Sequence, residues 1–169
     1  NIELKKIIAK KAGSLLRDGM DIFLDAGTTT FALIEEIVKH EKITIITYDM
    51  NIAMELSKYK NVKTYLLGGI LEPDTQCLLG IEGYKQVSSL HADICFSGTD
   101  AFDERFVYST NNIKAELKQK MLDNSKIKVL VCDSGKYPKD GLFAFYKLSD
   151  FDYIITDKQN ENLNKLIED

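Results

Sequence analysis

The sequence predicts an α/β fold, a three-layer sandwich in which helices cover both faces of a mostly parallel sheet of about six strands. Short runs of apolar and β-branched residues alternate along the chain with segments whose apolar residues recur at helical spacing. The chain has 169 residues, of which 44% are hydrophobic and 28% are charged. These values are typical of a globular protein, and residues 1–169 are expected to form a single domain.

The strands of the sheet are expected in the short apolar runs, which lie at 22–24, 43–47, 62–67, 94–97, 129–132 and 153–156. Most of these runs end in glycine, aspartate or a hydroxyl residue, which are common where a strand gives way to a turn. Such runs are typical of strands that are buried on both faces, as in a parallel sheet.

Helices are expected between the strands, at 2–17, 28–40, 51–57, 81–87, 113–121 and beyond 160. In the first, Leu4, Ile8, Ala12 and Leu15 recur at helical spacing, and Arg17-Asp18-Gly19 ends the helix. In the second, Phe31, Ile34 and Val38 are expected to share the buried face. The segment 71–80 contains Pro73 and shows no helical period, so an extended excursion is expected there.

Charge and composition exclude several classes of function. A formal net charge of −4 argues against nucleic-acid binding through the bulk surface, and no apolar run approaches the length needed to span a membrane. Cys95 and Cys132 lie inside apolar runs, where core packing is expected, and Cys77 lies in an expected loop. No metal-ligand spacing is present, and the scattered cysteines fit a reducing cytoplasm. No metal and no cofactor are expected.

A phosphate-binding loop is the central candidate site. Asp25 ends the first strand, Gly27 supplies a tight turn, and Thr28, Thr29 and Thr30 open the next helix. A helix start presents unpaired N–H groups and the positive end of its dipole, and glycine allows a ligand to approach the backbone closely. The alternative is that one threonine caps the helix and the others have no binding role.

In a parallel α/β sheet, the ligand site lies outside the carboxyl ends of the strands. The residues expected at that edge are Asp25, Ala26, Gly27, Thr28, Thr29, Thr30, Asp49, Gly68, Gly69, Gly98, Thr99, Asp100, Asp133 and Lys136. N–H groups, hydroxyls and a lysine suit a phosphate, and carboxylates suit sugar hydroxyls. The sequence therefore predicts a small phosphorylated polyol as the ligand.

Several well-known motifs are absent. No G-x-G-x-x-G follows the first strand, no P-loop is present around Gly135-Lys136, and no G-x-S-x-G is found. The Asp25-x-Gly27-Thr28 segment lacks the second acidic residue that phosphatases with an aspartate nucleophile use as a general acid.

The order of five segments resembles the DeoR family of transcriptional regulators. The segments are Leu24–Thr30, Leu67–Gly69, Ala92–Asp100, Ala115–Met121 and Asp133–Tyr137. The resemblance covers nearly the whole chain and implies a C-terminal sensor domain with a Rossmann-like fold, related to ribose-phosphate isomerases, glucosamine-phosphate deaminases and CoA transferases. It also places Lys118, in the fourth segment, among the expected ligand-binding residues.

The same resemblance implies further properties of the protein. The effector is expected to be a phosphorylated sugar or a related metabolite, and the protein is expected to be a homo-oligomer. Operator DNA is expected to bind through a winged helix-turn-helix that precedes this chain, which begins at Asn1 without a methionine. Asp49, Lys114 and Gly135 depart from the residues usual in the family. The first two change the charge at or near the expected site, so the resemblance does not identify the sugar.

The competing interpretation is an enzyme of the same fold, a sugar-phosphate isomerase or deaminase. Asp100 and Asp103 form a D-x-x-D pair that could hold a substrate and move protons. The lysine- and glycine-rich segment of the isomerases and the His-containing segment of the deaminases are both absent, so no catalytic residue is expected. A third interpretation, a purely structural oligomerisation module, leaves the polar strand ends unexplained.

Overall fold

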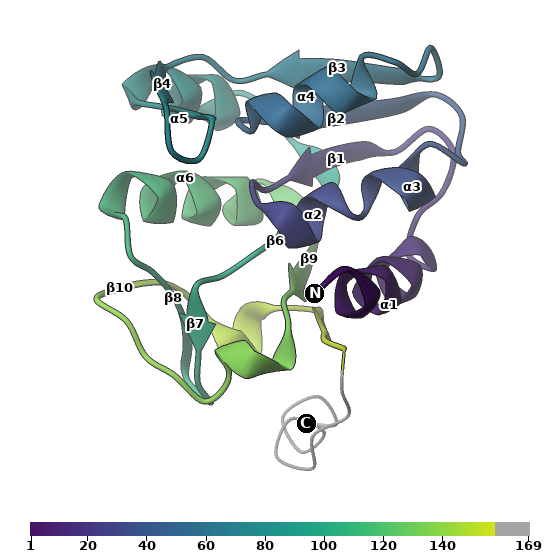
Figure 1. Cartoon of the computed structure of the whole chain (residues 1–169). Helices are drawn as coiled ribbons and strands as arrows, with labels where there is room; N and C mark the ends of the chain where they lie inside the picture. The colour runs from purple at the N-terminus through teal and green to yellow at the C-terminus, as the bar shows by residue number, and fades with distance from the viewer. Residues whose placement is uncertain (158–169) are drawn as a thin grey trace.

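A six-stranded sheet forms the centre of the computed structural model, which describes residues 1–157 (Figure 1). Its strands are β1 (Asp21–Leu24), β2 (Ile43–Thr47), β3 (Val62–Leu66), β6 (Ala92–Ser97), β9 (Ser125–Val131) and β11 (Tyr153–Ile155). They run in the order β11-β9-β6-β1-β2-β3, and each neighbouring pair is parallel. The predicted parallel sheet of six strands is confirmed.

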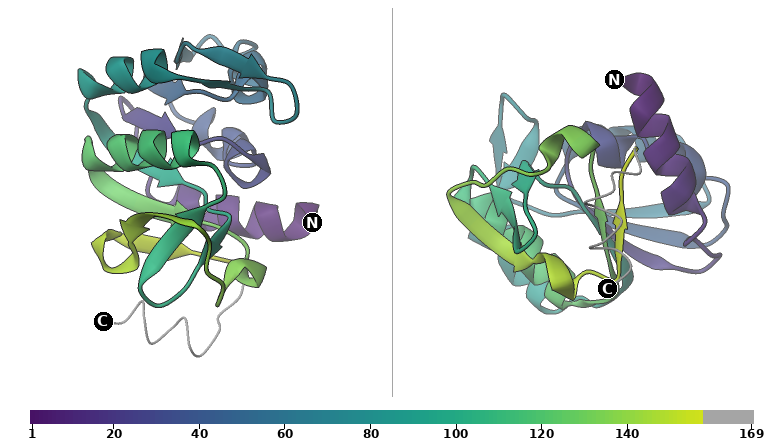
Figure 2. Two further views of the ribbon diagram at one scale, coloured as in Figure 1. Left: turned by 90° about the vertical axis from the view of Figure 1, so that its left-hand side faces the viewer. Right: turned by 90° about the horizontal axis from the view of Figure 1, so that it is seen from below.

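Helices cover both faces of this sheet, as Figure 2 shows. The first face packs against α1 (Ile2–Gly13), α2 (Thr28–Phe31), α3 (Ile34–Ile37) and α4 (Met50–Leu56). The opposite face packs against α5 (Ile81–Ser88) and α6 (Asn112–Asp123). The predicted three-layer arrangement is therefore confirmed.

Two apolar cores follow from the alternation of side chains along the central strands. In β1, Ile22 and Leu24 point to the core beneath α1 to α4, whereas Phe23 points to the core beneath α5 and α6. All three side chains have no exposed surface. Because both faces of β1 are buried, its carboxyl end is held firmly at the edge where the candidate site lies.

The helix expected at 28–40 is two short helices. α2 ends at Phe31, α3 begins at Ile34, and the backbone between them forms a turn. The break changes the buried face, so Leu33 and Ile37 are fully buried while Phe31 is 38% exposed. The expectation that Phe31 packs in the core was wrong. α1 also ends at Gly13, earlier than expected, and the terminal helix expected beyond 160 lies outside the described residues.

Short antiparallel strands occupy segments that showed no clear period in the sequence. β4 (Ile70–Glu72) and β5 (Cys77–Leu79) form a two-stranded ribbon in place of the expected excursion. β7 (Ala101–Phe102), β8 (Phe106–Ser109) and β10 (Phe143–Lys147) form a separate three-stranded sheet that packs against α6. Two 3-10 turns, η1 (Ser134–Lys136) and η2 (Leu148–Asp150), flank β10 in the sequence.

All three cysteines are free and buried. Core packing of Cys95 and Cys132 is confirmed, and burial raises the pKa of both thiols. The placement of Cys77 in a loop was wrong, because Cys77 begins β5 and is 2% exposed. Across residues 1–157, every helix is too short or too polar to cross a membrane.

Candidate functional site

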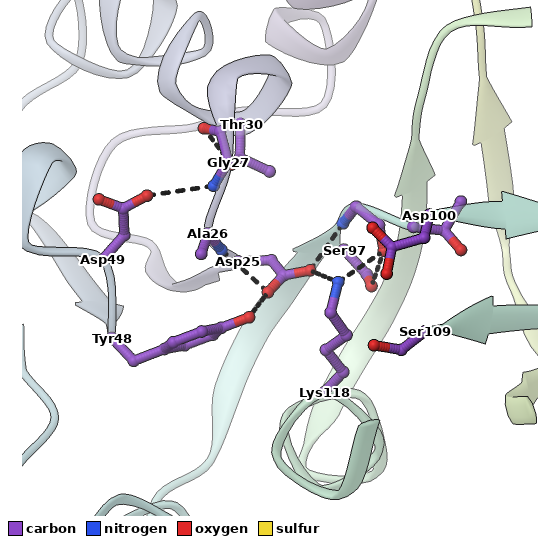
Figure 3. Close-up of polar contacts among 12 residues, drawn as sticks. Asp25, Ala26, Gly27, Thr30, Tyr48, Asp49, Ser97, Asp100, Ser109 and Lys118 are labelled. Atoms are coloured by element: carbon purple, nitrogen blue, oxygen red, sulfur yellow. Dashed lines mark hydrogen bonds and ion pairs between the residues drawn. The ribbon is translucent and has the colours of Figure 1, made fainter. Parts of the chain in front are cut away.

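The loops that follow β1, β2 and β6 meet at one edge of the sheet, as Figure 3 shows. Asp25 follows β1, Tyr48 and Asp49 follow β2, and Gly98 and Asp100 follow β6. These strands are neighbours in the sheet, so residues distant in sequence come together at their carboxyl ends.

A buried ion pair lies among the loops at this edge of the sheet. The Lys118 ammonium, from α6, lies 2.7 Å from Asp25 Oδ2, and the two residues are 8% and 1% exposed. Two backbone N–H groups, those of Gly98 and Ala26, donate to the same carboxylate at 2.9 Å. The Tyr48 hydroxyl donates to Asp25 Oδ1. Asp25 therefore supports the site and holds Lys118 in place, although Asp25 was predicted from the sequence to bind the ligand itself.

Burial, together with the neighbouring Asp25 carboxylate, raises the pKa of the Tyr48 hydroxyl well above its ordinary value. Tyr48 therefore stays neutral and remains a hydrogen-bond donor to Asp25. A donor that cannot ionise keeps the carboxylate satisfied across the physiological pH range.

Asp49 connects the loop after β1 to α4. Its Oδ1 accepts the N–H groups of Asn51 at 2.8 Å and Ile52 at 3.2 Å and so caps α4. Its Oδ2 accepts the N–H of Gly27 at 3.1 Å. Gly27 has a φ of 123°, a conformation that favours glycine, and its N–H is already engaged by Asp49. The pair therefore fixes the path of the phosphate-binding loop expected from the sequence.

A cavity of about 390 Å³, called here the first lobe, opens at this edge. Its lining includes most of the expected site residues, namely Ala26, Gly27, Thr28, Thr29, Thr30, Gly98, Thr99, Asp100, Lys118, Asp133 and Lys136, together with Asn1, Lys5, Val131 and Cys132. Among residues 1–157, the hydroxyls of Thr28 and Thr29 make no hydrogen bond, whereas Thr30 Oγ1 donates to the Gly27 carbonyl at 3.1 Å. Lys5 and Lys136 form no ion pair within that part of the chain.

A second cavity of about 290 Å³, the second lobe, shares Ala26, Gly27, Asp100 and Lys118 with the first. Its other lining residues are Tyr48, Thr75, Cys77, Thr110 and Lys114. None of these residues was predicted from the sequence to bind the ligand. Tyr48 could have been predicted as a lining residue because it follows a strand. Thr75 and Cys77 lie in the β4–β5 ribbon, which the sequence pattern does not predict.

Asp100 lies where the two lobes join. Its Oδ2 accepts the N–H of Thr110 at 2.9 Å and the Thr110 hydroxyl at 3.2 Å. Partial burial acts to raise the pKa of Asp100, but the Thr110 hydrogen bonds and the charges of Lys118 and Lys136 outweigh it and hold the pKa below its ordinary value. Asp100 is therefore an ionised acceptor beside the cavity.

Asp103, the expected partner of Asp100 in a catalytic pair, instead accepts hydrogen bonds within a turn. Its Oδ1 accepts the N–H groups of Arg105 and Phe106, and its Oδ2 accepts the Tyr108 hydroxyl at 2.7 Å. These bonds close the turn between β7 and β8. Asp103 lines neither lobe, so the two carboxylates do not form an acid–base pair in the crevice.

Gly68 and Gly69 also lie outside both lobes. They lead from β3 into the β4–β5 ribbon, where Gly69 has a φ of 148° and a Cβ would lie 2.5 Å from the Leu79 carbonyl oxygen. The ribbon therefore needs glycine at this position for packing. Within residues 1–157, no group of three or more His, Cys, Asp or Glu side chains is arranged to hold a metal ion.

Comparison with known proteins connects this geometry to a family of regulators. The family described as the DeoR C-terminal sensor domain matches residues 1–158. The HTH-type transcriptional regulator GolR of Listeria innocua is 32% identical over 171 residues, which cover all of this chain and 67% of GolR. The HTH-type transcriptional repressor GlcR of Bacillus subtilis is 30% identical and is matched over 92% of this chain and 60% of its own length. The lactose phosphotransferase system repressor of Staphylococcus epidermidis is 33% identical, over 97% of this chain and 65% of its own length.

The chain thus spans between 60% and 67% of the length of these relatives. Solved structures share the fold at lower identity. Ribose 5-phosphate isomerase A of Neisseria gonorrhoeae matches with a TM-score of 0.57 and 17% identity, over 84% of this chain and 54% of its own. The translation initiation factor eIF-2B of Pyrococcus horikoshii matches with a TM-score of 0.62 and 15% identity, over 92% of this chain and 62% of its own.

Proposed function

Because this chain belongs to the family of DeoR C-terminal sensor domains, a family of transcriptional regulators and not of enzymes, we propose that its crevice binds a phosphorylated sugar as effector. The observation that carries the proposal is the first lobe. It brings together hydroxyls and ammonium groups that have no partner among residues 1–157, and the Asp100 carboxylate, around a volume of about 390 Å³. This set of groups matches a phosphate attached to a polyol.

The phosphate is assigned to the side of the first lobe where α2 begins. The Thr28 and Thr29 hydroxyls are unbonded there among the described residues, and the α2 N-terminus adds backbone N–H groups. Lys136 and Lys5 line the same lobe and supply positive charge without an internal carboxylate partner among residues 1–157. Asp133 accepts the N–H of Gly135 at 2.9 Å and so shapes the turn that carries Lys136.

The sugar hydroxyls are assigned to the junction of the two lobes. Asp100 presents a carboxylate there, and Lys118 presents an ammonium that is already oriented by Asp25 and by the Gly98 carbonyl, which lies 3.2 Å from its Nζ. One relative is named for the lactose phosphotransferase system, and that name agrees with a phosphorylated sugar as effector.

For the whole protein, we propose that a helix-turn-helix segment outside this chain binds operator DNA, since the relatives are named HTH-type regulators and are longer than the chain. Binding of the sugar phosphate would change operator affinity. The protein is proposed to work in the cytoplasm as a homo-oligomer.

Calorimetry with ribose, fructose, tagatose and glucosamine phosphates, each against its unphosphorylated sugar, tests the ligand class. Lys136→Met should weaken binding of the phosphorylated sugar by roughly 1–3 kcal/mol, because it removes a charge-assisted contact. It should leave the weak binding of the unphosphorylated sugar unchanged. Lys139→Met is the matched control, since Lys139 is exposed in the same loop and does not line the first lobe.

The proposal is wrong if no phosphorylated sugar binds more tightly than its parent sugar. An equal loss of affinity for both ligands in Lys136→Met would show that Lys136 supports the fold and does not contact phosphate. No turnover of these four phosphates is expected, because Asp103 is committed to the β7–β8 turn. Turnover that disappears in Asp100→Asn would support an isomerase or deaminase in place of a sensor.

A further inference from the structure

The second lobe contains a cation that the structure leaves without a hydrogen bond. The side chain of Lys114 is only 18% exposed, and its ammonium makes no hydrogen bond among residues 1–157. Its nearest carboxylate oxygen is Glu72 Oε1, 3.8 Å away, which is beyond hydrogen-bonding distance. That same oxygen accepts the Thr75 hydroxyl at 2.7 Å. Glu72 is thus held by the ribbon and forms an ion pair with Lys114 without a hydrogen bond.

Lys114 is one of the residues that line the second lobe. Cys77 lines it too, and burial raises the pKa of the Cys77 thiol while the nearby Lys114 charge partly opposes that shift. The Thr75 and Thr110 side chains line the same lobe and bring hydroxyl groups to it. Both hydroxyl protons are already donated, from Thr75 to Glu72 and from Thr110 to Asp100, so the Lys114 ammonium is the donor in this lobe without an acceptor among residues 1–157. A largely buried ammonium of this kind favours an anionic ligand.

The place of Lys114 on α6 adds to this positive potential. Asn111 caps α6 by accepting the Lys114 N–H at 3.0 Å, so Lys114 lies in the first turn of a helix of 12 residues. A cation in the first turn faces the positive end of the helix dipole, which is unfavourable, and a bound anion would offset this cost together with Glu72. The Asp100 carboxylate at the junction is turned to Thr110 and accepts two hydrogen bonds from it.

We infer that the second lobe is an anion subsite, and that the effector is a sugar phosphate carrying a second anionic group at the opposite end of its carbon chain. This inference rests on the proposed function, which assigns the first phosphate to the first lobe. The two lobes share Ala26, Gly27, Asp100 and Lys118, so one ligand can occupy both. The second group is a phosphate or a carboxylate, since the Lys114 ammonium can donate to either.

Two ligand pairs distinguish these chemistries. In the first, fructose bisphosphate, with a phosphate at each end, is compared with the fructose phosphate that carries only the phosphate on carbon six. In the second, phosphogluconate is compared with the glucose phosphate that lacks its carboxylate. By calorimetry on the wild-type chain, at least one doubly anionic ligand is expected to bind about tenfold or more tightly than its partner, the scale of one charge-assisted hydrogen bond.

Lys114→Met should abolish this preference and leave binding of the singly phosphorylated partner within about twofold. Lys114→Arg should retain it, because the positive charge remains. Lys126→Met is the matched control: its side chain is 80% exposed, its only ion pair within the described residues is with Asp93, and it lies at the start of β9, away from the crevice. This variant should behave as wild type.

The inference is overturned if the wild type binds both members of each pair equally, or if Lys114→Met keeps the preference. Either result leaves the proposed function intact, because a sugar phosphate still binds. If the wild type binds none of the four ligands and no phosphate of the larger panel, the proposed function fails and the inference fails with it. Lys136→Met distinguishes the roles of the two lobes. It should weaken the binding of all four ligands while keeping the preference for the doubly anionic members.

Discussion

At the scale of single residues, the site is organised by a buried charge that the ligand is not expected to touch. Asp25 is satisfied by Lys118, Tyr48 and the N–H groups of Ala26 and Gly98. Such a fully satisfied buried network fixes side-chain positions, whereas loss of one partner leaves an uncompensated charge. Lys118 therefore has two roles, as partner of Asp25 and as a group that lines both lobes.

The variant Lys118→Met should lower the free energy of unfolding by about 3–5 kcal/mol, because it leaves the Asp25 carboxylate buried without its cation. Urea denaturation measures this change. The double variant Asp25→Asn, Lys118→Met should recover part of the loss, since the unpaired charge is gone. A loss below about 1 kcal/mol, the value typical of an exposed pair, would contradict the buried network.

Asp100 gives the site a dependence on pH. Partial burial raises its pKa, but the hydrogen bonds from Thr110 and the charges of Lys118 and Lys136 lower it more strongly. A carboxyl with a lowered pKa stabilises the fold above its unfolded pKa, which is ordinarily 3.8, and loses that contribution as the pH falls through the folded pKa.

The stability difference between wild type and Asp100→Asn should therefore favour wild type at neutral pH and shrink as the solution is acidified below the ordinary pKa of aspartate. Urea denaturation of both proteins across that range measures it. A difference that stays constant with pH would show that Asp100 contributes no charge-dependent stability.

At the scale of secondary-structure elements, the loop between β1 and α2 depends on α4. Asp49 caps α4 through Asn51 and Ile52 and also accepts the Gly27 N–H. The candidate phosphate-binding loop is thus positioned by a neighbouring helix start as well as by its own glycine.

For Asp49→Ala, we expect a loss of about 0.5–2 kcal/mol in the free energy of unfolding, the usual cost of removing an N-cap, and weaker sugar-phosphate binding. Asn111→Ala provides the comparison, because Asn111 caps α6 without bonding to the loop after β1. It should lose similar stability while binding in the first lobe changes less. Equal changes in binding for both variants would contradict a specific link between Asp49 and the loop.

The sequence predicted the elements whose apolar pattern is regular and missed those whose pattern is short. All six parallel strands were predicted because buried runs such as Ile43–Thr47 are bounded by turn residues. The β4–β5 ribbon and the sheet of β7, β8 and β10 were missed, because their strands lie outside the regular alternation of strand and helix along the chain. The second lobe was missed for the same reason, since Thr75 and Cys77 reach it through that ribbon.

The first lobe could be predicted from sequence because the rule about strand ends uses only strand positions. This rule placed five residues at one edge of the sheet without any knowledge of packing, namely Gly27, Thr28, Thr29, Asp100 and Lys136, and all five line the first lobe. The rule could not separate groups that line the cavity from groups that support it. Asp25 and Asp49 were therefore predicted as ligand contacts, while their hydrogen bonds show a positioning role. For the residues that line the lobe, binding of the ligand stays a prediction.

At the scale of the whole molecule, several large apolar side chains are exposed to solvent. Ile70 and Ile81, on the ribbon and at the start of α5, are 78% and 59% exposed, and Leu142 is 82% exposed. Contiguous apolar patches mark protein interfaces, so we expect an oligomer to cover part of this exposed apolar surface.

We expect the 169-residue chain to form a homo-oligomer and to show no specific binding to duplex DNA. Sedimentation measures the first property, and gel shifts at several salt concentrations measure the second. A monomer at all concentrations would contradict the first expectation. Salt-resistant binding to one operator sequence by this chain alone would contradict the second.

The central claim is that a sugar phosphate lies in the first lobe with its phosphate against Thr28 and Thr29. An amide NMR titration tests it most directly, using the tightest phosphorylated sugar of the calorimetric panel and then the same sugar without phosphate. We predict that the phosphorylated sugar shifts the amide signals of Thr28, Thr29 and Lys136 most strongly, and that the unphosphorylated sugar leaves these three signals nearly unchanged. Shifts that instead cluster away from the first lobe, or identical shifts with both sugars, would contradict the account.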